Sequence, residues 1–577
     1  MKGINLRRFA AIGAALLLAA CGGETEYDLV VRGGTIIDGS GKPGYRGDVA
    51  VTGDRIAYVG PHAAGKGKVE IDAIGRAVAP GFINMLSWSN ESLLIDGRGQ
   101  GELRQGVTLE VMGEGESMGP LTPVMKDDLV AQQGDLKYPV EWTTLGEYLE
   151  TLERKGISLN VASHIGAATA RMNLLGSEDV DPTPEQLAAM QDVVRKAMEE
   201  GALGVGSSLI YVPGTFAETD ELVALAESAG RCGGIYATHM RSEGGKFLEA
   251  IDETIEISRR SGAPAEIYHL KAAGRANWPK MDEAIARIEA ARKQGLRITA
   301  DMYSYPAGST GLDAAMPPWV QEGGNAAWYA RLRDPAIRAR VAAEMRSDDT
   351  DWENLMRMAG GAEQVLIVVL RNPALKPLIG KTLAEIAKER GIDPETAAMD
   401  LVAEDESRVG AIYFLMSEEE VARKVGLPFM SFGSDGSAVS AEGVFLKSNL
   451  HPRGYGNFAR VLGRYVRDEK RARLEDAIRR MTAHPAAVLG LRDRGSLAAG
   501  HYADIVVFDP ATIQDHATYV DPHRYATGVS HVVVNGEIAL ADGEPTDARP
   551  GRFVRGRAWT GAKDGGCRAS AGDWDWP

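Results

Sequence analysis

The sequence is poor in cysteine, in aromatic residues and in positive charge. Its 577 residues include three cysteines, Cys21, Cys232 and Cys567, and no Cys-x-x-Cys pair. We therefore expect neither a disulfide framework nor a cysteine zinc ribbon. Aromatic residues make up 6% of the chain whereas glycine occurs 68 times, which fits many tight turns between strands and helices. The net charge of −16 argues against nucleic acid as a partner, because phosphate binding requires a basic surface.

The N-terminal apolar run, residues 9–20, is too short for a comfortable membrane span. Basic residues precede it and small residues follow it, a pattern typical of an export signal. Its Leu-Ala-Ala-Cys21 ending resembles a bacterial lipoprotein box, which implies cleavage before Cys21 and a lipid anchor at its sulfur. Gly22 favours an outer-membrane location facing the periplasm; an ordinary secretory signal with an incidental cysteine is the alternative. We expect an exported protein of the bacterial cell envelope, with residues 1–21 outside the fold.

Two histidines stand at the ends of two similar apolar runs. Ile-Tyr-Ala-Thr leads to His239, Ala-Glu-Ile-Tyr leads to His269, and a helix-like segment separates them. A strand, a helix and a second strand form a βαβ unit, so the strands should be parallel with their C-terminal ends side by side. In a (β/α)8 barrel that rim collects catalytic and metal-binding groups. Either histidine alone would more often be structural, but two at matching strand ends favour a shared site.

The chain length suits a barrel with an appended domain. Alternating apolar residues between glycine-containing turns predict antiparallel hairpins in residues 27–77. A similar sequence pattern occurs in residues 490–560. We expect both ends to build one small β-sandwich beside a barrel over residues 78–489. Residues 328–426 are rich in helix formers and charge and are too long for a βα loop, which predicts an inserted subdomain near the barrel mouth.

A series of short motifs follows this plan along the chain. The motifs are Ala77-Val-Ala-Pro-Gly-Phe-Ile-Asn84, Gly106-Val-Thr, Tyr236-Ala-Thr-His239-Met-Arg241-Ser-Glu243, His269-Leu-Lys271, Asp301-Met-Tyr303-Ser-Tyr-Pro-Ala-Gly-Ser309-Thr, Phe432-Gly-Ser-Asp435-Gly, His451-Pro-Arg453 and Arg494-Gly-Ser-Leu-Ala-Ala-Gly-His-Tyr-Ala-Asp504. Together they resemble the amidohydrolase superfamily and, within it, the N-acyl-D-amino-acid deacylase (D-aminoacylase) family. The resemblance implies an α/β fold, a TIM-like (β/α)8 barrel of a metal-dependent hydrolase.

Two strand ends depart from the family pattern. The first barrel strand of the family ends in His-x-His, but this chain has Leu86 and Trp88 there, and neither side chain binds zinc. At the next strand end, where the family usually has a cysteine ligand, this chain has Glu114, whose carboxylate can coordinate zinc as the thiolate did. Glu116 is the substitute if the alignment gap lies elsewhere. Whether Trp88 closes a second metal site or stacks on substrate stays open.

The resemblance then implies a site rebuilt around one zinc ion per chain. Glu114, His239 and His269 would be its ligands, a set that matches catalytic zinc with an open position for water. One-metal acetylamino-sugar deacetylases of the same superfamily have a similar ligand pattern. Asp435, after the last barrel strand, would accept the proton of the water and return it to the departing amine. The alternative role for Asp435 is a turn-capping aspartate.

The resemblance also implies how a substrate would be held. Lys271, Tyr303 and Ser309 would bind the carboxylate of an acylated amino acid, because an ammonium and two hydroxyls form a fitting anion receptor. Arg241 follows His239 by two residues, and we expect it to orient Glu243 or to contact substrate.

Four further residues are weaker candidates. Tyr211 either faces the substrate or packs with its hydroxyl satisfied. His164 ends a probable strand among apolar neighbours, which favours a structural role. His451 and Arg453 rank below the other candidate site residues.

These observations predict zinc-dependent hydrolysis of the amide of N-acyl-D-amino acids, or of dipeptides containing a D-residue. The enzyme alternative is a cyclic-amide hydrolase of the dihydropyrimidinase or hydantoinase kind, which the missing His-x-His and the lack of a persuasive bridging lysine disfavour. The alternative from another class is an inactive lipoprotein that binds peptides. Leu86 and Trp88 favour it, and Asp435 argues against it. Oligomeric state, acyl and side-chain preference, and D versus L selectivity are open at this point.

Overall fold

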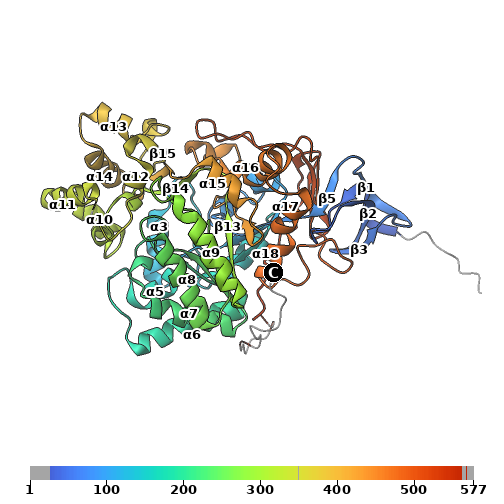
Figure 1. The fold of residues 1–577 in the computed structure, drawn as a ribbon, viewed down its shortest axis with the longest axis horizontal. Coiled ribbons are helices and arrows are strands. Elements are labelled where there is room, and N and C mark those ends of the chain that lie inside the picture. The colour runs from blue at the N-terminus through green and yellow to red at the C-terminus, as the bar shows by residue number, and fades with distance from the viewer. Residues whose placement is uncertain (1–25, 349, 560, 562–566, 568–577) are drawn as a thin grey trace, which may run out of the picture.

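The computed structural model describes residues 26–348, 350–559, 561 and 567. The predicted export signal, residues 1–21 with Cys21, lies outside the described residues. Figure 1 shows a barrel surrounded by helices in the middle of the molecule, with a sheet at one end and a helical subdomain at the other.

Parallel strands form the barrel. Three of them pair in the order β6 (Phe82–Asn84), β7 (Val107–Met112) and β8 (Asn160–Ser163). The others follow in the order β9 (Ile165–Gly166), β10 (Gly204–Ser208), β11 (Ile235–His239), β12 (Ala265–Ile267), β13 (Ile298–Met302) and β17 (Met430–Phe432). Met85 N–H donates to the Phe432 carbonyl oxygen at 3.2 Å, which links the first strand to the last. With β8 and β9 counted as one strand interrupted at His164, the described residues contain eight barrel strands, and the predicted (β/α)8 fold is confirmed.

Helices pack around the barrel strands. They are α1 (Ser92–Ile95), α2 (Gln100–Leu103), α3 (Pro123–Gln132), α4 (Leu145–Lys155), α5 (Ala167–Leu175), α6 (Pro184–Glu200), α7 (Thr219–Arg231), α8 (Phe247–Ser261), α9 (Met281–Lys293), α15 (Glu418–Lys424), α16 (Arg453–Arg460), α17 (Leu474–Met481) and α18 (Ala483–Val488). In α8, the helix between the two histidine strands, Phe247, Ile251 and Ile255 recur every four residues and are buried. That spacing forms one apolar face, which holds the helix against the barrel.

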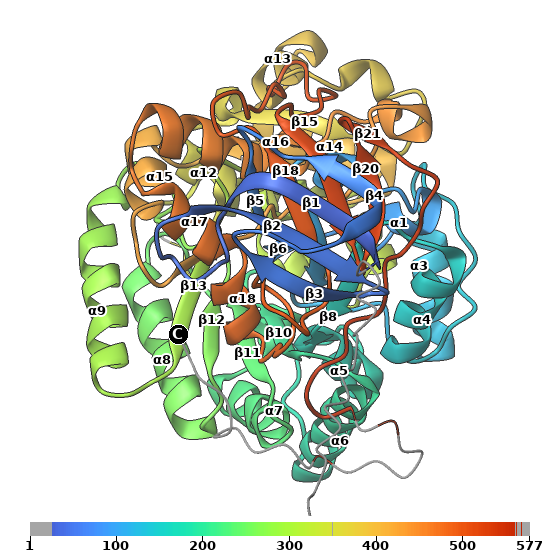
Figure 2. The same cartoon turned by 90° about the vertical axis from the view of Figure 1, so that its right-hand side faces the viewer.

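Both chain ends build the sheet domain. Its strands are β1 (Glu26–Ile36), β2 (Tyr45–Thr52), β3 (Arg55–Gly60), β4 (Lys66–Asp72), β5 (Ala77–Pro80), β18 (Ile505–Phe508), β19 (Val529–Val534), β20 (Glu537–Ala541) and β21 (Glu544–Pro545). β18 pairs antiparallel with β5 and β19, so strands from the two ends lie side by side (Figure 2). The predicted domain of both chain ends is confirmed, as one continuous sheet.

The domain boundary differs slightly from the prediction. Residues 77–80 belong to the sheet domain, because β5 pairs with β1 and β18. Gly81 separates β5 from the first barrel strand. A Cβ at Gly81 would lie 2.2 Å from Thr108 Oγ1, so the close approach of the two segments requires glycine there.

A subdomain lies between β13 and β17 at the barrel rim. Its sheet is β14 (Ala307–Gly311), β16 (Gly410–Phe414) and β15 (Val365–Val369), and its helices are α10 (Asn325–Arg331), α11 (Pro335–Arg346), α12 (Leu355–Ala359), α13 (Leu383–Arg390) and α14 (Pro394–Asp405). The subdomain has its own apolar core, which includes Trp328 and Tyr413. It begins earlier than residue 328, because β14 belongs to its sheet, and α15 precedes β17 as a barrel helix does.

The cysteine expectation needs a correction. Cys232, at the end of α7, forms a disulfide with Cys567, 335 residues further along the chain. With only three cysteines and so large a separation, spacing did not indicate the pair. The C-terminal segment is thereby attached to the barrel.

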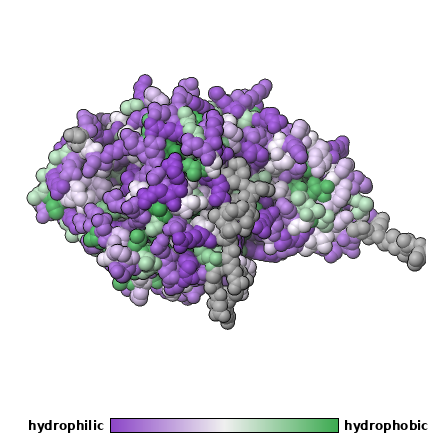
Figure 3. Space-filling view, turned by 60° about the horizontal axis from the view of Figure 1, so that its bottom comes forward, coloured by the Kyte–Doolittle hydropathy of each residue, from purple (hydrophilic) through white to green (hydrophobic). Residues whose placement is uncertain are grey.

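The described part of the chain contains no helix long and apolar enough to cross a membrane. Figure 3 shows one face of the molecule, on which hydrophilic residues predominate and hydrophobic ones form small separate groups.

Candidate metal centre

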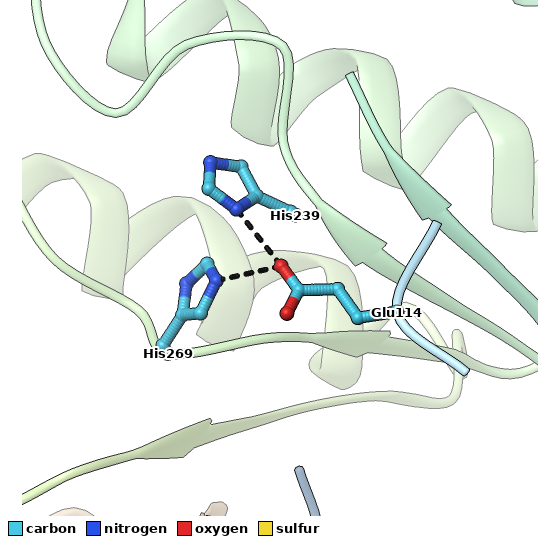
Figure 4. Close-up of side chains that lie close together, drawn as sticks. All are labelled: Glu114, His239 and His269. Carbon is cyan, nitrogen blue, oxygen red and sulfur yellow. Dashed lines mark hydrogen bonds and ion pairs between the residues drawn. The ribbon is translucent and has the colours of Figure 1, made fainter. Parts of the chain in front are cut away.

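Three buried side chains meet at the C-terminal rim of the barrel (Figure 4). Glu114 lies in the loop after β7, His239 is the last residue of β11, and His269 follows β12. Glu114 Oε1 lies 2.9 Å from His239 Nδ1 and 3.1 Å from His269 Nε2. The three candidate ligand atoms all lie within 4.8 Å of one another. The structure thus brings together the three residues that the sequence predicted as ligands.

Unusual backbone conformations hold two of the site residues in place. His269 has φ 35° and Asp435 has φ 49°, the left-handed region that side chains rarely adopt. Such residues cost about 1–3 kcal/mol each and persist where surrounding contacts over-determine them. His269 N–H donates to Asp301 Oδ1 at 2.7 Å, and Asp435 N–H donates to the Leu86 carbonyl oxygen at 2.8 Å. These contacts indicate that the site geometry is imposed by the barrel.

Glu243 lies behind both histidines. Its Oε1 is 3.0 Å from His269 Nδ1, and its Oε2 is 3.7 Å from His239 Nε2. These are the ring nitrogens that do not face Glu114. Lys271 Nζ donates to Glu243 Oε1 and also lies 2.8 Å from His269 Nδ1. A carboxylate in this position fixes the orientation and tautomer of metal-binding histidines.

The electrostatics of the cluster favour charged groups. Burial raises the pKa of Glu114, but attraction by His269 and hydrogen bonding with His239 outweigh it and lower that pKa well below its usual range. Burial also raises the pKa of Glu243, and the Lys271 ammonium reverses the shift. Burial and Lys271 lower the pKa of His269, but Glu243 and Glu114 raise it to about 10. Two carboxylates therefore stay ionised in a buried site, a setting suited to a cation.

Asp435 lies on the other side of Glu114. Burial raises the pKa of Asp435, the Arg453 guanidinium opposes that shift and the Glu114 carboxylate adds to it; the net shift is upward. Arg453 Nη1 forms an ion pair with Asp435 Oδ2 at 2.8 Å. Trp88 Nε1–H donates to both carboxylates, to Glu114 Oε2 at 2.9 Å and to Asp435 Oδ1 at 3.1 Å. Two residues that sequence analysis ranked low or left open thus hold the candidate base.

The predicted carboxylate receptor is partly engaged within the protein. The Lys271 ammonium contacts Glu243, His269 Nδ1 and, at 3.2 Å, the His269 carbonyl oxygen. Ser309 Oγ donates to the Ala411 carbonyl oxygen at 3.1 Å. Within the described residues, the buried Tyr303 hydroxyl has no hydrogen-bond partner.

Aromatic rings and guanidinium groups surround the centre. The Tyr211 ring lies 5.4 Å from the His239 ring, and the Arg408 guanidinium lies 4.9 Å from the Tyr211 ring. The Arg453 guanidinium lies 4.7 Å from the Tyr303 ring. Tyr211 is therefore close to the candidate ligands, and Tyr303 is joined to the Asp435 side of the site.

Arg241 does not have its predicted contact with Glu243. Its guanidinium pairs with Glu253 of α8 at 3.0 Å and donates to the carbonyl oxygens of Thr215 and Ala217. Glu253 is the nearer carboxylate once α8 packs beside the strand end, so Arg241 stabilises the surrounding loops. Lys271 is the cation that pairs with Glu243 instead.

Three further candidates have other positions. Glu116 is exposed and is not part of the three-ligand group, in which Glu114 stands. His164 is buried against Tyr268, and burial lowers the pKa of this histidine to about 3. His451 Nδ1 accepts a hydrogen bond from Arg453 N–H at 3.0 Å, which makes it a support for Arg453.

Sequence reasoning missed the role of Glu243 and underrated Arg453. The spacing of four residues between His239 and Glu243 was the available signal, but a strand end followed by a turn does not bring such residues together by any simple periodicity. Asn84 is a further missed support. Its amide donates to Ser434 Oγ at 2.8 Å and accepts from Ser434 N–H at 2.7 Å, next to Asp435.

One carboxylate oxygen and two imidazole nitrogens are a donor set typical of catalytic zinc sites, which keep a further position open. A (β/α)8 barrel with such a set at its C-terminal rim defines a class, the metal-dependent barrel hydrolases. The presence of a second carboxylate, Asp435, beside the set fits this class.

Comparisons with known proteins agree with this class. The model of the amidohydrolase family matches residues 69–540. N-acyl-D-glutamate deacylase of Alcaligenes xylosoxydans xylosoxydans is 34% identical over 538 residues, which cover 92% of this chain and 97% of that protein. The chain therefore belongs to the amidohydrolase family.

Solved structures resemble the whole described fold. N-acyl-D-glutamate deacylase from Bordetella bronchiseptica, complexed with zinc and a phosphonate inhibitor that mimics the tetrahedral intermediate, has a TM-score of 0.75 at 32% identity. A D-aminoacylase with a binuclear metal centre, in which one metal activates and the second attenuates, also has a TM-score of 0.75 at 32% identity. Each match covers 92% of this chain and 100% of the other.

Proposed function

We propose that this protein is a zinc-dependent deacylase that hydrolyses the amide of N-acyl-D-amino acids, or of dipeptides that contain a D-residue. The observation that carries the proposal is the convergence of Glu114, His239 and His269 beside Asp435. Relatives named for the hydrolysis of N-acyl-D-amino acids, which align over most of the chain, support the substrate class.

The donor set fits a zinc ion. Its oxygen and two nitrogens are those that zinc binds in catalytic sites. Within the described residues, buried His239 Nε2 has no hydrogen-bond partner, and Glu243 Oε2 at 3.7 Å is the carboxylate that faces it. Zinc in this set supplies Lewis acidity, which lowers the pKa of a water molecule and polarises an amide carbonyl.

Asp435 is the proposed general base. Its carboxylate is near the ligand set, and its raised pKa suits a group that takes a proton from water and gives it to the departing amine. Arg453 and Trp88 each bind one of its two oxygens, which fixes the orientation of the carboxylate. Fixed orientation is a large part of what an enzyme supplies to proton transfer.

The free carboxylate of the substrate needs cationic and hydroxyl partners. The unpartnered Tyr303 hydroxyl and the neighbouring Arg453 guanidinium offer them, with Lys271 held by Glu243 behind the site. Two arginines near the rim, Arg408 and Arg453, support an anionic substrate.

Hydrolysis of paired N-acetyl-D- and N-acetyl-L-amino acids by the purified full chain, including acidic D-residues and D-containing dipeptides, tests the proposal. Zinc-dependent release of the free D-amino acid is expected. Asp435→Asn should lose most of this activity, whereas Asp400→Asn, which alters an ion pair with Arg338 in the subdomain, should not. Binding of these compounds without turnover in the zinc-loaded protein would instead indicate an inactive peptide-binding protein.

We further propose export and lipid attachment at Cys21. The Cys232–Cys567 disulfide supports export, because disulfides persist in oxidising compartments. Metabolic labelling with a radioactive fatty acid should label the wild-type protein in the membrane fraction and should not label Cys21→Ser. An unlabelled wild-type protein released into the soluble fraction would contradict the anchor.

A further inference from the structure

We propose that Trp88 is a positioning residue that restricts this centre to a single metal ion and holds Glu114 and Asp435 in register. The inference rests on the proposed zinc site and concerns one feature of it. It explains what a tryptophan does beside this ligand set, when a similar D-aminoacylase has a binuclear metal centre.

The two carboxylate oxygens of Glu114 have different partners. Oε1 faces the histidine nitrogens at 2.9 and 3.1 Å. Oε2 accepts the Trp88 indole N–H at 2.9 Å, and the same N–H lies 3.1 Å from Asp435 Oδ1. Glu114 is therefore set to give a metal one oxygen, because its other oxygen is occupied.

The backbone of Trp88 is anchored to the segment that carries Asp435. Trp88 N–H donates to the Gly436 carbonyl oxygen at 2.8 Å, and the Trp88 carbonyl oxygen accepts from Ser437 Oγ at 2.8 Å. These bonds tie the Trp88 backbone to the Asp435 segment, and the indole N–H adds a side-chain link to Asp435 Oδ1. Trp88 is 37% exposed, so part of this residue reaches solvent.

Two buried carboxylates that face each other need a positive partner between them. In a centre with two metals, the second cation can provide it. In this chain, the indole N–H stands between Glu114 and Asp435. Indole offers a proton but no lone pair, so it bridges the carboxylates without becoming a ligand.

Among the described residues, no neighbouring side chain completes a second group of metal ligands. Leu86 is fully buried in an apolar cluster beneath the rim. Within the described residues, the one group of three or more potential metal ligands is Glu114, His239 and His269. The described residues thus provide one metal site. The space between Glu114 and Asp435 beside it is occupied by the Trp88 indole N–H, a hydrogen-bond donor.

Zinc per chain in four purified full-length proteins tests the inference. Wild type should bind one zinc. Trp88→His offers an imidazole lone pair near Glu114 Oε2 and Asp435, and should bind a second, weaker zinc. Trp88→Phe keeps an aromatic ring but removes the hydrogen-bond donor. Trp559→Phe, at an exposed tryptophan of the C-terminal segment, is the matched control and should bind the same amount of zinc as wild type.

Kinetics and spectroscopy separate positioning from a structural role. Trp88→Phe should lower kcat about tenfold or more, the effect of losing a hydrogen bond to charged groups, with KM little changed. In the cobalt-substituted protein its visible absorption should weaken, because Glu114 becomes free to bind through both oxygens and coordination rises. Trp559→Phe should change neither quantity.

Several results would overturn the inference. They are two zinc ions in the wild type, a single zinc in folded Trp88→His, or a Trp88→Phe protein with raised KM and unchanged kcat, which would indicate substrate stacking. If Trp88→Phe does not fold, the zinc content of Trp88→His decides. A wild type that binds no zinc and hydrolyses no acyl amino acid would refute the proposed function instead.

Discussion

Replacing Glu243 by glutamine should weaken zinc binding without touching any of the three ligands. The carboxylate faces His269 Nδ1 at 3.0 Å and His239 Nε2 at 3.7 Å. When His269 Nε2 binds a metal, its Nδ1 carries the ring proton and needs an acceptor. A carboxylate that accepts the remaining ring N–H of a metal-bound histidine contributes about 10–100-fold to metal affinity, or roughly 1.4–2.8 kcal/mol.

The structure places the effect near the upper end of that range. Glu243 Oε1 also accepts from the Lys271 ammonium, which is 6% exposed. Glutamine keeps one carbonyl oxygen for both donors and loses the charge. A buried cation left without its counterion costs about 3–5 kcal/mol of unfolding free energy, so the melting temperature should fall as well.

Competition with a chromophoric chelator would measure the zinc dissociation constant, and chemical unfolding would measure stability. Glu253→Gln is the matched control, because Glu253 pairs with Arg241 and has no contact with either histidine. It should lose some stability and keep zinc affinity. Equal zinc affinity in Glu243→Gln and wild type would refute the idea that this carboxylate orients the histidines.

Two further predictions concern protons. The Arg453 guanidinium opposes the upward shift in the pKa of Asp435, so Arg453→Met should raise that pKa further. Because the ionised base is the active form, the acid limb of kcat against pH should then move to higher pH. An unmoved limb would exclude Asp435 as the base. The pKa of His269 is raised to about 10, so near pH 8 the metal-free ring holds a proton that zinc must displace. Calorimetry in buffers of different ionisation enthalpy should detect the release of about one proton per zinc, and zinc affinity should rise with pH up to about 10; binding without proton release would contradict this charge state.

Local pattern was sufficient to predict the parallel βαβ unit and its two histidines, whereas the complete (β/α)8 barrel was implied by the family resemblance. His239 and His269 follow apolar runs separated by one helix, and parallel strands bring such ends together whatever surrounds them. Glu114 required a resemblance as well, because only the position of a family ligand distinguished it from Glu116. These predictions depend on the order of strands, helices and motifs along the sequence, which can be read without the folded structure.

The contacts that sequence analysis could not predict are long-range ones. Arg241 pairs with Glu253 because α8 packs across the strand end, and Cys232 pairs with Cys567 because the C-terminal segment returns to α7. Trp88 follows the first barrel strand and Asp435 follows the last. The hydrogen bond between them joins residues that are 347 positions apart in the chain. Residue types alone left several partners open for each of these side chains, and tertiary packing selected one.

The most direct test is the zinc content of the purified wild-type chain beside Glu114→Ala and Glu116→Ala. One zinc per chain in the wild type and in Glu116→Ala, with zinc and acyl-amino-acid hydrolysis both lost in Glu114→Ala, is the predicted result. An active wild type without zinc, or Glu114→Ala with undiminished zinc, would contradict a centre built on Glu114, His239 and His269.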